Sequence, residues 1–154
     1  MKNETRVERK SEREVVITRT FNASARIVFE AWTKAELMRR WWVPKSIGIT
    51  LLSCEMDGRT GGSYRFVFEH PAAPDGMAFF GRYLEVSPHS RLVWTNDESG
   101  DAGQLSTLTL EDHGDTTRIV LHELYPSAEA FEAAKGSYDG IAESFGQLDA
   151  LLAG

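Results

Sequence analysis

Hydrophobic and polar residues alternate along this chain with two different periods, and the changes of period mark the predicted elements. A period of two is typical of a strand with one buried face, and a period of three to four is typical of an amphipathic helix. The alternation is clearest over 63–70, where aromatic residues and His70 take every second position. We expect seven strands, at 14–21, 47–56, 63–70, 77–86, 91–95, 105–111 and 116–124.

The helical period occurs in three places. Residues 25–32 and 35–41 predict two short helices, the second ending before Pro44. The stretch 127–152 predicts one long helix of about 25 residues, near 38 Å, with Ser127 as its cap. Gly136 and Gly140 each cost this helix roughly 1 kcal/mol, which suggests close packing, a bend or room beneath it. Its apolar face comprises Phe131, Ala134, Tyr138, Ile141, Phe145, Leu148 and Leu152.

The order of these elements defines the expected fold. It runs strand, two short helices, six strands and long helix, and the short connections between strands favour an antiparallel meander. The predicted class is α+β, with a curved antiparallel sheet of about seven strands wrapped on the long C-terminal helix. We expect one domain over 14–154, preceded by a flexible tail over 1–13, where charged residues show no apolar period.

Composition narrows the possible function. The 154 residues carry a formal net charge of -6, which argues against nucleic-acid binding. Cys54 is the single cysteine, so no internal disulfide is possible and a reducing compartment is natural. No apolar run reaches the roughly 18 residues that span a membrane, and the N-terminus has no signal-peptide apolar region. We therefore expect a cytoplasmic protein with no membrane insertion.

Aromatic side chains supply the main candidate site. Bulky residues on a curved sheet and its helix either fill the core or line a pocket that they do not fill, and small-molecule sites are concave and mostly apolar. Because Trp41 and Trp42 are consecutive, both cannot point into the core from one helix, and one is expected at the rim. The predicted ligand-binding residues are Trp32, Trp41, Trp42, Phe66, Phe68, Phe79, Trp94, Glu123, Tyr138, Ile141 and Phe145.

Two neighbouring polar residues compete for the inner face of the last strand. If Val120 faces inward, so does His122, whereas inward Ile119 and Leu121 would bring Glu123 with them. The larger pair favours the second arrangement. A buried Glu123 carboxylate would need a partner such as Tyr138, or its pKa would rise. Two interpretations stay open for the inward residue. It is a strand-end group whose hydrogen bonds are satisfied within the protein, or it acts on a ligand as an orienting group or general base.

Other chemistry finds little support. His70, His89, His113 and His122 lack ligand-like spacing, so no metal site is expected. No G-x-S-x-G nucleophile motif occurs. Gly61-Gly62 does not form a phosphate loop, because it opens a strand rather than a helix. We therefore assign no catalytic residue and no cofactor from the sequence.

Four strings and their order carry a resemblance to a known family. They are 29–32 (FEAW) leading to Trp41-Trp42, 54–62 (CEMDGRTGG), 81–88 (GRYLEVSP), and 124–127 (LYPS) with the helix that ends at 148–152 (LDALL). Over about 14–152 the chain resembles the helix-grip, Bet v 1/START-like (SRPBCC) superfamily. Within it, the chain is similar to the branch of the C-terminal domain of the activator of Hsp90 ATPase. Relatives tend to have Met between the two helix glycines, where this chain has Ser137 and Tyr138.

The resemblance implies three functions, which stay open at this point. The first is binding of a small apolar or aromatic ligand in a cavity between sheet and C-terminal helix. The second is a cochaperone-like interaction module, and the third is a cyclase-type or hydrolase-type enzyme that uses the same cavity. Catalysis is the less favoured alternative. An exposed edge strand makes a homodimer a further expectation.

Overall fold

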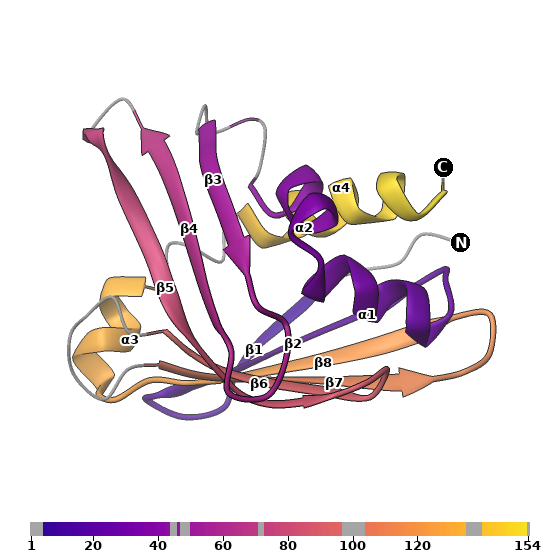
Figure 1. The fold of residues 1–154 in the computed structure, drawn as a ribbon. Coiled ribbons are helices and arrows are strands. Elements are labelled where there is room, and N and C mark those ends of the chain that lie inside the picture. Colours follow the sequence, from indigo (N-terminus) through magenta and orange to yellow (C-terminus); the bar gives the residue numbers. More distant parts are fainter. Residues whose placement is uncertain are drawn as a thin grey trace.

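The computed structural model describes residues 5–43, 46, 50–70, 73–96, 104–134 and 140–153. Strands and helices follow one another as the sequence periods predict (Figure 1). Strand β2 shows why, because its residues alternate strictly between buried and half-buried positions. The elements are β1 (Arg6–Arg9), β2 (Glu14–Phe21), α1 (Ala25–Thr33), α2 (Ala35–Trp41), β3 (Thr50–Met56), β4 (Ser63–His70), β5 (Ala73–Ser87), β6 (Arg91–Asn96), β7 (Gln104–Asp112), β8 (Thr117–Leu124), α3 (Ala128–Ala134) and α4 (Ile141–Ala153).

The eight strands of the described residues join one antiparallel sheet in the order β1-β2-β8-β7-β6-β5-β4-β3. Strand β5 is 15 residues long and belongs to both halves of this sheet. Its first part, up to Arg82, pairs with β4, and its second part, Tyr83–Ser87, pairs with β6. Strands β3, β4 and the first part of β5 therefore rise as an arm from the rest of the sheet (Figure 1).

Irregular pairing accompanies this bend. The register shifts between Tyr83 and Glu85 on β5, and again between Leu51 and Ser53 on β3, and such bulges increase local twist. Gly81 lies just before the bend, where a Cβ atom would come within 1.9 Å of the Thr95 carbonyl oxygen. The Tyr64 hydroxyl donates a 2.7 Å hydrogen bond to that same oxygen. The bend thus requires glycine at position 81, where the backbones of β5 and β6 approach closely.

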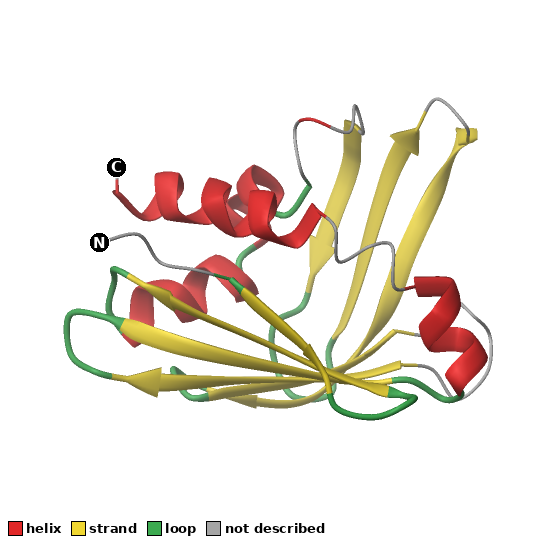
Figure 2. Cartoon of the chain, turned by 180° about the vertical axis from the view of Figure 1, so that it is seen from behind, coloured by secondary structure: helices red, strands yellow, loops and turns green. Residues whose placement is uncertain are grey.

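Three helices, α1, α2 and α4, lie on the inner side of the bent sheet (Figure 2). Helix α4 packs against α2. Side chains of α4 donate hydrogen bonds to carbonyl groups at the C-terminal end of α2, which have no partner within their own helix. Ser144 donates to the Trp42 carbonyl oxygen at 2.9 Å, and Gln147 donates to the Trp41 carbonyl oxygen at 2.9 Å. These contacts fix the end of α2, and with it the position of the Trp42 backbone.

The predicted strand count of about seven differs by one, because β1 lies in the segment expected as a flexible tail. Strand β1 pairs with β2 and carries an exposed residue at every position, so its sequence has no buried period to detect. Besides this backbone pairing, side-chain contacts connect the segment to the rest of the protein. The Arg9 guanidinium lies 4.3 Å from the centre of the Phe131 ring, and Arg19 donates a 2.7 Å hydrogen bond to Thr5.

The C-terminal stretch forms two helices where the sequence predicted one. Helix α3 ends at Ala134 and α4 begins at Ile141, and the two occupy separate places in both views (Figures 1 and 2). Residues 135–139 lie outside the described residues, so Tyr138 and Gly136 cannot be placed. Ser127 caps α3 as predicted, accepting a 3.0 Å hydrogen bond from the Ala130 amide. The expected α+β helix-grip architecture is confirmed, but its single long helix is not.

Candidate functional site

The centre of the inner face is a packed aromatic cluster. The Trp32 ring lies 4.8 Å from Trp41 and 6.1 Å from both Trp94 and Phe145, measured between ring centres. Trp41 and Phe145 are each only 1% exposed. The Trp41 indole N–H donates to the Ala31 carbonyl oxygen at 3.0 Å, which satisfies its buried polar group. Of the predicted site residues, Trp32, Trp41 and Phe145 therefore belong to the core.

Trp42 occupies the rim, as the argument from consecutive tryptophans predicted. It is half-buried, and its ring lies 4.9 Å from Phe66, 5.6 Å from Phe79 and 6.3 Å from Phe68. Phe66 and Phe68 are 5% exposed, whereas Phe79 is half-buried. The structure thus packs Trp42, at the end of α2, against three other predicted residues that lie on the arm of the sheet.

Two further predicted residues, Trp94 and Ile141, are half-buried where they pack against the core. Trp94 stands on β6 against Trp32, and Ile141 begins α4. Tyr138, the remaining predicted residue on the C-terminal stretch, lies outside the described residues. The inner face therefore holds a fully buried centre flanked by aromatic and aliphatic side chains that keep part of their surface exposed.

The orientation of β8 follows the favoured alternative. Ile119 and Leu121 are 0% and 3% exposed, so the period of two places Glu123 on the same inner face. The Tyr125 hydroxyl donates to the Glu123 carboxylate at 3.3 Å, the role that the sequence suggested for Tyr138. His122 faces the outer side, where one of its ring nitrogens lies 2.8 Å from a Glu14 carboxylate oxygen. His122 and Glu123 therefore cannot act on one bound molecule.

Sequence reasoning missed two polar residues of the inner face. Ser106 lies opposite Trp94 on β7 and is 2% exposed, and its other neighbour across the ladder is Glu123. Asn96 follows Trp94 by two residues on β6, so the strand period puts it on the same side. The strand period could have identified Asn96 from the sequence, because Trp94 had already been assigned to this face.

Two ionisable groups near the arm have raised pKa values. Burial raises the pKa of the Cys54 thiol, whose sulfur lies 3.8 Å from the Ala35 carbonyl oxygen. Burial also raises the pKa of the Tyr83 hydroxyl, chiefly because the charged form loses hydration. A raised pKa disfavours the thiolate, so Cys54 is a poor nucleophile at neutral pH.

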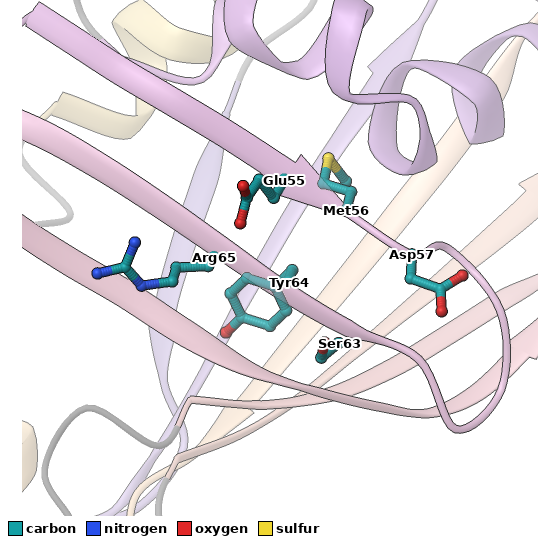
Figure 3. Close-up of a pocket in the computed structure, with 6 residues that line it drawn as sticks. All are labelled: Glu55, Met56, Asp57, Ser63, Tyr64 and Arg65. Carbon is teal, nitrogen blue, oxygen red and sulfur yellow. The ribbon is translucent and has the colours of Figure 1, made fainter.

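An open hollow of about 260 Å³ lies at the end of the β3–β4 hairpin (Figure 3). It is lined by Glu55, Met56, Asp57, Ser63, Tyr64 and Arg65. None of the predicted ligand-binding residues contributes to it. This hollow is therefore a surface feature of the hairpin and not the expected space between sheet and helix.

In the part of the chain that the structure describes, no three His, Cys, Asp or Glu side chains gather in a group that could hold a metal ion. No helix in the described ranges has the length and apolar character needed to cross a bilayer.

Comparison with known proteins agrees with this architecture. A curved, unclosed antiparallel sheet with helices on its inner side defines the helix-grip class. The family model described as "Activator of Hsp90 ATPase homolog 1-like protein" matches residues 22–153, and the chain belongs to this family. No curated protein matches the chain.

Solved structures show the same fold at low sequence identity. A protein from Rhodobacter sphaeroides is 24% identical with a TM-score of 0.85, covering 97% of this chain and 98% of its own. Protein Ms6760 from Mycobacterium smegmatis is 22% identical with a TM-score of 0.81, over 97% and 98%. An AHSA1-like protein from Aeromonas hydrophila is 16% identical with a TM-score of 0.69, over 88% and 93%.

Proposed function

We propose that this protein binds a small apolar or aromatic molecule on the inner face of the sheet, beside α4. One observation carries the proposal: Trp42, Phe79 and Trp94 keep part of their surface exposed on a face whose centre is fully buried. When an apolar ligand covers exposed aromatic surface of this kind, the burial favours binding by about 25 cal/mol per Å². The arrangement also matches the usual small-molecule site, which has apolar walls and a few polar groups.

The polar groups on this face would orient the ligand. Ser106 and Glu123 are cross-strand neighbours beside the aromatic wall. Such groups contribute to specificity more than to affinity, because each must exchange its hydrogen bonds with water for hydrogen bonds with the ligand. The proposed site therefore combines an aromatic surface on the arm with a polar end on β7 and β8.

Fluorescence titration with prodan, a naphthalene whose emission reports an apolar environment, tests the proposal. We expect saturable binding by the wild type and at least about tenfold weaker binding by Trp42→Ala, which removes the rim ring. Leu84→Ala is the matched control, because Leu84 is 47% exposed and does not belong to the aromatic rim. No saturable binding, or equal affinities for the two variants, would contradict the proposed site.

A cochaperone-like interaction is the second candidate, and exposed apolar residues on β5 favour it. Phe80 pairs with Arg65 on the face opposite Phe66, and it is 40% exposed; Leu84 lies at the bulge. Exposed apolar patches often mark protein-binding surfaces. If this candidate is right, the wild-type protein should stimulate an Hsp90-type ATPase, Phe80→Ser should abolish this stimulation, and Trp42→Ala should retain it.

A further inference from the structure

The indole N–H of Trp32 lacks the hydrogen bond that buried polar groups almost always make. Trp32 is 6% exposed, and its Nε1 atom is buried with no partner among the described residues. The neighbouring Trp41, in the same cluster, does satisfy its N–H through Ala31. A buried donor without an acceptor reduces stability, so such a group in a native structure calls for an explanation.

A second unpartnered atom lies on the same face. The Asn96 side-chain oxygen Oδ1 is buried, and no described residue donates to it. Asn96 stands two positions beyond Trp94 on β6, about 7 Å along the strand, and the Trp94 ring contacts Trp32. A donor without an acceptor and an acceptor without a donor thus lie on the same face, one against the Trp94 ring and the other two residues along β6 from it.

We propose that Trp32 and Asn96 form a hydrogen-bonding pair that selects the ligand of the proposed site. The ligand class is a neutral aromatic molecule with a carbonyl oxygen at one end, which accepts from Trp32, and a hydroxyl at the other, which donates to Asn96. The aromatic wall formed by Trp32 and Trp94 explains the ring. The Glu123 carboxylate faces the same side and disfavours an anionic ligand. This inference rests on the proposed binding function and adds the chemistry of the ligand.

Two naphthalenes of similar size, one with polar substituents and one without, test the pair. 6-Acetyl-2-naphthol carries the carbonyl and the hydroxyl at opposite ends, and 2-ethylnaphthalene carries neither. In competition with prodan, we expect the wild type to prefer 6-acetyl-2-naphthol by roughly five- to fiftyfold, since binding satisfies both buried atoms. Trp32→Phe keeps a ring but removes the N–H, and should reduce this preference by roughly five- to twentyfold while leaving hydrocarbon affinity within about threefold.

Trp41→Phe is the matched control. It also removes one indole N–H, but one that already has its acceptor within the protein, so the preference between the two probes should stay unchanged. Asn96→Leu should reduce the preference through the loss of the acceptor for the hydroxyl.

The outcomes separate this inference from the proposed function. If both naphthalenes bind and Trp32→Phe leaves their ratio unchanged, the hydrogen-bonding pair is wrong while the binding site stands. If neither binds, both proposals fail. Should Trp32→Phe not fold, the wild-type indole resonance of Trp32 gives the answer by ¹H–¹⁵N NMR. It should move downfield with 6-acetyl-2-naphthol and not with 2-ethylnaphthalene, and equal shifts would overturn the pair.

Discussion

Two halves of the inner face differ in how completely they are covered. On β2, β7 and β8 the inward residues Ile17, Leu108 and Ile119 are fully buried in the core, where α1 contacts β7 and the Phe145 ring of α4 contacts Phe21 of β2. On the arm formed by β3, β4 and the start of β5, Leu51 and Phe79 stay half-buried beside Trp42. The same sheet therefore uses one half for stability and leaves the other with apolar surface that a ligand can cover. Mutations in the two halves should separate these roles.

The largest effect is expected in the covered half. Phe145→Ala removes a ring that is 1% exposed and packs 5.5 Å from the Phe21 ring, so it leaves a cavity. We expect a loss of about 3–5 kcal/mol in the free energy of unfolding, measured by urea denaturation. Phe80→Ala on the outer side of the arm, where the ring is 40% exposed, should cost less than about 1 kcal/mol. Equal losses would show that burial does not determine the size of the effect in this sheet.

The next effect concerns the ion pair that joins β2 to α4. Arg19 is 8% exposed and pairs with Asp149, so Asp149→Ala leaves a cation buried without its counter-charge. We expect a loss of about 2–4 kcal/mol by urea denaturation. The control is Glu132→Ala, which removes the partner of Arg9 in a pair that is exposed on both sides and should cost at most about 1 kcal/mol. If the control costs as much as Asp149→Ala, burial is not what makes the first pair important.

The smallest effect is expected on the outer face. The hydrogen bond with His122 lowers the pKa of Glu14 below its ordinary value of 4.5, and a second one from Ser11 adds to this. Because the folded-state pKa is lower, the ionised carboxylate stabilises the protein above the ordinary pKa, and this contribution is lost as pH falls through the lowered value. Wild type and Glu14→Gln should therefore differ slightly in urea midpoint at neutral pH and converge as the pH falls below the ordinary value of 4.5. A difference that grows on acidification would contradict this linkage.

Periodicity predicted the elements whose stability comes from one buried face. The strands β2 and β4 and the helices α1 and α2 lie within about one residue of their expected ranges, because burial at every second or every third to fourth position determines them. The inward orientation of Glu123 rather than His122 followed from the same argument. Local order in this protein is thus largely encoded in local pattern.

Contacts between distant segments could not be predicted in this way. Strand β1 pairs with β2, and its Arg9 contacts Phe131, some 120 residues away, but no local period predicts either interaction. The division of the C-terminal helix was suggested only by the cost of Gly136 and Gly140. Whether Trp32 and Asn96 find partners among the described residues depends on which groups the fold brings near them, and this cannot be read from composition or local pattern.

The bulge on β5 also determines how this strand tolerates a change in length. Removing one residue from a regular strand turns every later side chain to the opposite side, which would bring polar groups into the core. Leu84 is the extra residue between Tyr83 and Glu85, whose partners on β6 are the adjacent residues Trp94 and Val93. Deleting Leu84 would therefore restore simple alternation and keep every neighbour on its present side. The arm would lose curvature rather than sequence register, so its angle to the rest of the sheet is a property that a single deletion can adjust.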